Sequence, residues 1–181
     1  MAVSSNMLEL GTRAPDFDLL DVVNNVKVSK EQFVGRPLLV MFICAHCPYV
    51  IHVEKEIARV ANDYKERIAF VAISANDIIA YPSDSPENLK AQAIRLGFSF
   101  PYLFDSSQAV ARAYKAACTP DFFLFDENHK LVYRGRLDDS RPKSETQVSG
   151  KDLRVALEAV LDHKIIEKQY PSMGCNIKWR D

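Results

Sequence analysis

The order of apolar and polar residues along the chain predicts alternating strands and helices. Two uninterrupted apolar runs, at 37–43 and 68–73, have the length of strands buried on both faces of a sheet. Between them, apolar residues recur every three or four positions from Val50 to Tyr64, which predicts an amphipathic helix. A strand, a helix and a strand in this order form a right-handed unit in which the two strands are parallel.

Shorter patterns on both sides of this unit predict further elements. Residues 16–19 and 26–28 alternate between polar and apolar side chains, which is typical of a hairpin. In chain order we expect a helical turn at 29–33 capped by Ser29, a loop at 74–85, a helix from Pro86 that ends at Gly97, and an extended piece at 101–104. These elements are followed by a helix from Asp105 to about Ala117, strands at 122–125 and 131–133, a mobile polar loop at 138–149, and a helix capped by Ser149 that reaches Leu161. No period marks residues 1–13 or 170–181, which we interpret as a lead-in and a tail of one domain spanning 1–181.

Composition and charge narrow the classes of function. The 181 residues include 23 Lys and Arg against 24 Asp and Glu, so the net charge is -1 and no basic surface for nucleic acid or an anionic membrane is expected. The longest apolar run, 37–44, is too short to cross a bilayer. The first residues lack the basic patch and apolar core of a signal peptide, so we expect a cytoplasmic protein with no nucleic-acid or membrane partner.

The sharpest chemical signal is the motif Cys44-Ala45-His46-Cys47, which lies between the first buried strand and the helix that follows. In a cytoplasmic chain, a close cysteine pair is more typical of catalysis or metal binding than of a structural disulfide. Free N–H groups at a helix N-terminus stabilise a thiolate, and cysteines one turn apart can close a small disulfide ring. We therefore expect Cys44 to be the exposed nucleophile and Cys47 to point into the helix.

His46 lies between the two cysteines, where a protonated imidazole would favour the Cys44 thiolate and raise the reduction potential. The alternative is a solvated histidine without effect. Two further alternatives concern the cysteines, which would be either a zinc half-site or inert buried thiols. A structural zinc site needs four ligands, and only His52 is close in sequence, so we expect no metal. No GxGxxG motif is present, and no organic cofactor is expected.

A family resemblance rests on the order of these features. The apolar strand 38–43, the motif 44–47 and Thr119-Pro120 before the strand 122–125 resemble the thioredoxin fold. The opening 14–17 and the strand 68–73 resemble the subgroup of alkyl hydroperoxide reductases and thiol-specific antioxidant proteins, which are peroxiredoxin-like. The resemblance covers about residues 14–161. It implies an α/β fold in which helices flank a central mixed β-sheet, with an N-terminal hairpin extension.

The resemblance also implies roles for residues near the second half of the sheet. Pro120 would be a cis proline that packs with Thr119 beside Cys44 and offers backbone groups to an extended substrate. An ordinary trans proline that opens a strand is the alternative. Cys118 and Cys175 are possible accessory thiols, although a buried inert thiol and a bystander thiol on the tail are the favoured interpretations.

Departures from the family pattern bear on activity. Ile43 stands where many thioredoxins have Trp, and the strand 38–43 lacks the acid that serves as proton acceptor, for which Glu54 is a weak substitute. Related peroxidases place a hydroxyl three residues before the reactive cysteine. Here that position holds Met41 when counted from Cys44, or Cys44 when counted from Cys47, so direct peroxidase chemistry is less favoured. Arg134 and Arg136 are the arginines that would supply positive charge to a reactive thiolate.

The sequence therefore predicts a thiol–disulfide oxidoreductase that uses Cys44 and Cys47 as its redox pair. Its partners would be a protein or small-molecule disulfide and an external thiol that donates electrons. A thiol-dependent peroxidase is the second hypothesis, and a peptide-binding module that does not use its thiols is the third.

Overall fold

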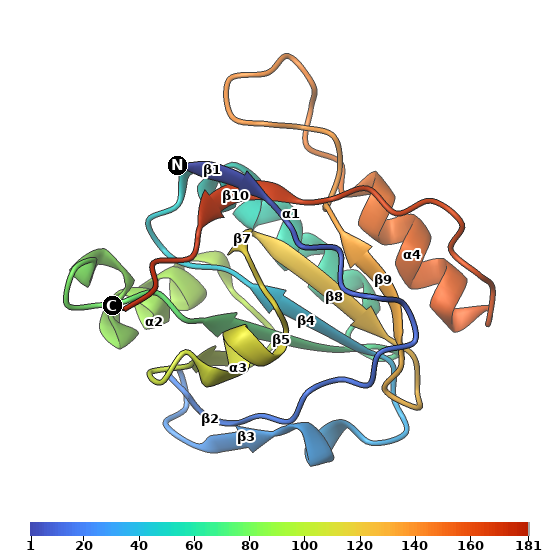
Figure 1. Ribbon diagram of the computed structural model, residues 1–181, viewed down its shortest axis with the longest axis horizontal. Helices are drawn as coiled ribbons and strands as arrows, with labels where there is room; N and C mark the ends of the chain where they lie inside the picture. The colour runs from blue at the N-terminus through green and yellow to red at the C-terminus, as the bar shows by residue number, and fades with distance from the viewer. Residues whose placement is uncertain (181) are drawn as a thin grey trace.

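The computed structural model describes residues 1–180, which form an α/β fold around a seven-stranded mixed sheet (Figure 1). The strand order is β3-β2-β6-β5-β4-β8-β9, with β4, β5 and β6 parallel and the remaining neighbours antiparallel. The mixed sheet and its flanking helices confirm the fold class that the sequence predicted. The N-terminal hairpin, β2 with β3, is also confirmed.

The elements of the structure have the following bounds. The strands are β1 Ala2–Ser4, β2 Asp18–Asp21, β3 Lys27–Ser29, β4 Leu38–Phe42, β5 Ala69–Ser74, β6 Tyr102–Phe104, β7 Cys118–Thr119, β8 Asp121–Phe125, β9 Leu131–Gly135 and β10 Met173–Asn176. The helices are α1 Pro48–Tyr64, α2 Pro86–Leu96, α3 Ala109–Ala113 and α4 Lys151–Leu161, with short 3-10 turns at Lys30–Phe33 and Pro82–Asp84.

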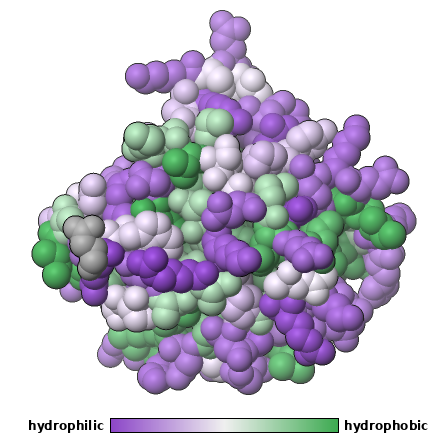
Figure 2. Space-filling model, in the orientation of Figure 1, coloured by the Kyte–Doolittle hydropathy of each residue, from purple (hydrophilic) through white to green (hydrophobic). Residues whose placement is uncertain are grey.

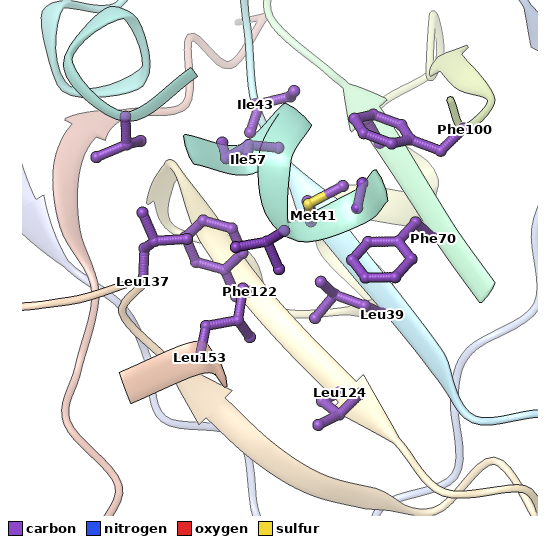
Figure 3. Close-up of a cluster of buried hydrophobic side chains, with 14 of the residues drawn as sticks. Leu39, Met41, Ile43, Ile57, Phe70, Phe100, Phe122, Leu124, Leu137 and Leu153 are labelled. Atoms are coloured by element: carbon purple, nitrogen blue, oxygen red, sulfur yellow. The ribbon is translucent and has the colours of Figure 1, made fainter. Parts of the chain in front are cut away.

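Alternate residues of the central strands supply two separate cores. Leu39 and Met41 of β4 pack with α1, α2 and α4 on one face of the sheet, where Phe122 of β8 joins them (Figure 3). Leu38 and Val40 face the opposite side, against α3 and the N-terminal segment. Both faces of β4 and β5 are covered, which explains why these strands are continuous apolar runs.

Two predicted helix starts differ from the structure, and a third start lacks its predicted capping bond. Ser29 precedes a 3-10 turn but makes no capping hydrogen bond. The helix α4 begins after Gly150 rather than Ser149, because the carboxylate of Asp138 accepts the backbone N–H groups of both residues at 2.7 Å. The helix α3 is shorter than predicted; it begins after Gln108, although the Asp105 side chain still accepts from the amide of Ala111 at 2.9 Å.

The two ends of the chain form a second, three-stranded sheet of order β1-β10-β7. The sequence pattern predicted no strand in either terminal segment. Both strands are short, and hydrophobic periodicity cannot be recognised over three or four residues. In Figure 1 the red tail lies between the blue N-terminal strand and the yellow strand β7. The tail therefore reaches the segment that contains Thr119 and Pro120.

The exterior of the fold includes a projecting loop and a surface of mixed hydropathy. The loop 138–149 projects between β9 and α4 in Figure 1, and Ser140 at its base contacts the ring of His52 at 3.1 Å. Hydrophilic side chains are spread over the face shown in Figure 2, with hydrophobic ones scattered between them. None of the helices in residues 1–180 is long and apolar enough to span a membrane.

Candidate functional site: a buried cysteine pair

The cysteine motif occupies the turn between the central strand β4 and the helix α1, as the sequence predicted. Cys47 is the N-cap residue of α1, with extended backbone angles, and Pro48 takes the first helical position. The carbonyl of Cys47 accepts the first helical hydrogen bond, from the amide of Ile51 at 2.9 Å. The pair is thus placed where the positive end of the helix dipole can stabilise a thiolate.

Neither thiol is exposed. The relative exposure is 1% for Cys44 and 0% for Cys47, so the expectation of an exposed Cys44 is wrong. The motif itself forms a surface turn, because Ala45 and His46 are only half-buried. Buried residues from distant segments, Asp84 and Thr119, contact the motif and help to cover the sulfur atoms, and neither packing interaction can be read from local sequence.

Thr119 lies against both cysteines. Its hydroxyl is 3.5 Å from the sulfur of Cys44, and the thiol of Cys47 donates to its carbonyl oxygen at 3.2 Å. The peptide bond between Thr119 and Pro120 is cis, which confirms the conformation that the resemblance implied. The structure thus brings together the four residues that the sequence assigned to the redox pair and the proline loop.

The two thiols perturb one another strongly. A hydrogen bond from Cys44, together with contacts to the Thr119 hydroxyl, Cys175 and the amide of Val50, lowers the pKa of Cys47 to about 4 despite its burial. The same hydrogen bond raises the pKa of Cys44, and burial and the negative charge of Asp84 act in the same direction. The donation by the Cys47 thiol belongs to the neutral dithiol; when the pair holds a single proton, these shifts place the proton on Cys44 and the charge on Cys47.

Asp84 is a site residue that the sequence analysis missed. It lies at the end of the predicted loop 74–85, yet its side chain is fully buried. Its carboxylate accepts from the amides of Ala45 and His46 at 2.8 and 3.0 Å, from Asn76 at 2.7 Å, and bonds to the ring of His46. No local pattern marks an acid in a loop as buried, since the burial depends on where the loop packs.

The surroundings of His46 differ from those that the sequence suggested. The ring is bonded through Nδ1 to Asp84 and stacks on Tyr81, with centroids 5.7 Å apart. The imidazole therefore lies next to a carboxylate whose negative charge would compensate any positive charge on the ring. Tuning of the cysteines would accordingly involve His46 and Asp84 together.

The two other cysteines have different environments. Cys118 is fully buried, and burial raises the pKa of its thiol, as does the nearby carboxyl group of Asp121. Cys175 is half-buried and lies on β10 directly opposite Thr119. It packs against the hydrophobic cluster that contains Cys44 and Cys47. The tail therefore brings a third thiol to the cysteine pair, which sequence spacing alone did not indicate.

Besides Asp84, two further buried acids lie close to the motif. Asp121, next to the cis proline, is opposite Phe42 of β4, and burial raises its pKa to about 8. Glu54 binds the guanidinium of Arg95 at 2.8 Å and Gln92 at 3.0 Å, so its charge is already paired. Asp121 is therefore the acid near this site that titrates close to neutral pH.

A metal ion has one potential set of ligands among the described residues. The donor atoms of Cys44, His46 and Asp84 lie within 4.8 Å of one another, and thiolate, imidazole and carboxylate all bind zinc. The fit is incomplete, because both oxygens of Asp84 already accept hydrogen bonds from the motif and from Asn76. A metal would have to displace the contact between His46 and Asp84.

Comparison with known proteins places this site in a family. The profile of the AhpC/TSA family matches residues 10–134, which include Cys44, Cys47, Asp84 and Pro120. The chain belongs to the AhpC/TSA family. A search of curated proteins found no match.

Solved structures share the fold of this chain. An uncharacterized conserved protein from Geobacillus kaustophilus is 51% identical, with a TM-score of 0.96 over 99% of this chain and 97% of that one. A hypothetical protein from Sinorhizobium meliloti is 46% identical, with a TM-score of 0.95 over 98% of both chains. A thiol:disulfide interchange protein of the thioredoxin family from Chlorobium tepidum shares 17% identity and a TM-score of 0.65, over 84% of this chain and 98% of that one, which shows the common fold.

Proposed function

We propose that this AhpC/TSA protein is a thiol–disulfide oxidoreductase that cycles Cys44 and Cys47 between a dithiol and a disulfide. The observation that carries the proposal is that both sulfur atoms lie against Thr119. The two cysteines themselves lie between the end of β4 and the start of α1. A thiolate held by a helix N-terminus and a second thiol within hydrogen-bonding distance are the two groups that thiol–disulfide exchange requires.

The reaction would transfer two electrons. Cys44 and Cys47 lose two protons and two electrons and form one S–S bond, while a partner disulfide takes them up and becomes two thiols. The sequence analysis proposed Cys44 as the group that attacks the substrate. The hydrogen bonds around the pair and the negative charge of Asp84 favour Cys47 as the thiolate when the reduced pair loses a proton. Attack by Cys44 would therefore follow transfer of its proton to Cys47.

A thiol-dependent peroxidase is the second hypothesis for the activity of the cysteine pair and is less well supported. The position that would carry the peroxide-binding hydroxyl is held by Met41, which is fully buried among apolar side chains. Arg136 donates to Asp152 at 2.7 Å and lies over the ring of Tyr170, so its charge is paired elsewhere. The partners we propose are a disulfide substrate and an external thiol donor in a reducing compartment such as the cytoplasm.

The test is a glutathione-buffered redox titration of the whole chain, followed by alkylation and mass spectrometry. We expect a reversible two-electron transition that forms a Cys44–Cys47 disulfide, and the same transition in Cys118→Ser. Metal content is measured on the same sample, and peroxide consumption is measured in parallel.

Absence of a Cys44–Cys47 disulfide at every ratio of thiol to disulfide would refute the proposal. Stoichiometric zinc would then favour a metal site, and its absence would favour a peptide-binding module. Fast, saturable peroxide consumption with a sulfenate that dimedone traps in Cys47→Ser would replace the oxidoreductase by a peroxidase.

A further inference from the structure

The structure raises the question of how a buried cysteine pair exchanges electrons with an external thiol. Cys44 and Cys47 have relative exposures of 1% and 0%, so neither sulfur is open to a partner. Cys175 is the half-buried thiol beside them. It lies on β10, opposite Thr119, whose carbonyl oxygen is 3.2 Å from the sulfur of Cys47.

The position of Cys175 is fixed by backbone contacts on both sides. β10 pairs with β1 on one side and with β7 on the other. Gly174 brings the two backbones so close that a Cβ there would lie 1.9 Å from the carbonyl oxygen of Thr119. Beyond β10, the amide of Lys178 donates to Asn76 at 2.8 Å, and Asn76 in turn binds Asp84 of the site. The tail is thus built into the site rather than laid over it.

The same pairing occupies the edge that an extended substrate would use. The residues before the cis proline, Cys118 and Thr119, are paired with Asn176 and Cys175 of the tail. A polypeptide substrate cannot add as a strand at this edge while β10 is there. The accessible partner is therefore a small thiol or disulfide that reaches a single half-buried sulfur atom.

We propose that Cys175 is a third redox thiol, which forms a disulfide with Cys47 and exchanges electrons between the buried pair and a low-molecular-weight thiol or disulfide. This inference rests on the proposed function, because it uses the Cys44–Cys47 disulfide as its starting state.

Each step is a thiol–disulfide exchange that conserves electrons. The Cys175 thiolate attacks the sulfur of Cys47; the Cys44–Cys47 bond breaks, Cys44 leaves as a thiolate and takes a proton, and the Cys47–Cys175 bond forms. An external thiolate then attacks Cys175, and Cys47 leaves as a thiolate. A second external thiolate attacks the mixed disulfide and releases Cys175, so two external thiols become one disulfide while Cys44 and Cys47 become thiols.

The acidities of Cys47 and Cys175 agree with the second step, in which an external thiolate attacks Cys175. The pKa of Cys47 is lowered to about 4, whereas burial and the nearby Cys47 raise that of Cys175 to about 11. The thiol of lower pKa is the better leaving group, so an external thiolate that meets the Cys47–Cys175 bond would displace Cys47 and bond to Cys175. Cys175 is also the more exposed of the two sulfurs.

The first experiment isolates the new disulfide. Cys44→Ser is oxidised with glutathione disulfide, alkylated and digested with trypsin, which places Cys47, Cys118 and Cys175 on separate peptides, 31–55, 116–130 and 169–178. We expect a Cys47–Cys175 disulfide within a monomeric chain. It should persist in Cys44→Ser/Cys118→Ser and be absent from Cys44→Ser/Cys175→Ser.

The second experiment measures the rate. In the chain with Cys44 and Cys47 intact, Cys175→Ser should slow oxidation of the pair by glutathione disulfide by about tenfold or more. Cys175→Ala is the second variant if the serine disturbs folding, and Cys118→Ser is the matched control. A merely structural role would change the unfolding midpoint but not the rate.

The outcomes separate this inference from the proposed function. If the wild-type chain forms Cys44–Cys47 but Cys44→Ser forms no Cys47–Cys175 disulfide, or if the oxidation rates are equal, the role of Cys175 is refuted and the oxidoreductase stands. If the wild-type chain forms only Cys47–Cys175, the third thiol stands and the proposed pair is refuted. If neither disulfide forms, both proposals fail.

Discussion

Replacement of Asp121 by Asn tests how a buried acid next to the cis proline couples stability to pH. Asp121 is fully buried; within residues 1–180 its Oδ1 atom has no hydrogen-bond partner, and its Oδ2 atom accepts a long bond of 3.5 Å from the amide of Ala117. Burial raises its pKa from the ordinary value of 3.8 to about 8. The folded protein therefore holds the proton up to a pH at which the unfolded chain has already lost it.

The sign and the size of the effect follow from this difference. Because the folded state binds the proton more tightly, the contribution of Asp121 to stability is complete below pH 4 and is lost as the pH rises toward 8. A difference of about four pH units, at about 1.4 kcal/mol for each, sets an upper limit of roughly 6 kcal/mol. Relaxation around the ionised carboxylate reduces the cost, so we expect about 3 kcal/mol.

The assay is urea unfolding of the wild-type chain and Asp121→Asn between pH 4 and pH 9. The amide cannot ionise, so the variant should lack this loss of stability. Its free energy of unfolding should lie within about 1 kcal/mol of the wild type at pH 4 and exceed it by about 3 kcal/mol at pH 8 to 9. Asp18→Asn is the control, since Asp18 forms an exposed ion pair with Lys27 and should change stability little at any pH. A difference between wild type and Asp121→Asn that does not change with pH would refute the reasoning.

Two further substitutions test the contacts that position the redox site. Asp84→Asn should lower the free energy of unfolding by about 2 kcal/mol, because an amide cannot accept from all the donors around Asp84, while Glu87→Gln on the next helix should have little effect. Asp84→Asn should also lower the pKa of Cys44, because the negative charge of Asp84 raises it. Alkylation of Cys44 measured against pH in a Cys47→Ser background tests this, and an unchanged pH profile would contradict it. Gly174→Ala should cost roughly 2 kcal/mol in urea unfolding and slow formation of the Cys47–Cys175 disulfide, because its Cβ would collide with Thr119. Gly11→Ala places its Cβ in open space, so it should cost only the backbone strain of a positive φ, about 1 kcal/mol. Equal stability of the two alanine variants would show that β10 is not held as closely as the structure indicates.

The sequence by itself determined the central unit of the fold and the place of the cysteine motif within it. The strands β4 and β5 are continuous apolar runs because both of their faces are covered, and the helix α1 shows its period because only one side is buried. The position of the cysteine motif between β4 and α1 follows directly from those two patterns. These features are local, so a reading of neighbouring residues was sufficient to find them.

Only the tertiary structure decided the environment of the two thiols. The burial of Cys44 depends on a loop 40 residues later that brings Asp84 to the motif, and the third thiol arrives with a tail strand 128 residues after Cys47. The helices predicted to start at 105 and 149 begin instead after Gln108 and Gly150, and in the second case the carboxylate of Asp138 accepts the backbone amides at the helix start. Hydrogen bonds and strand pairs between distant segments leave no periodicity in the sequence, whereas the burial of a whole strand or helix face does.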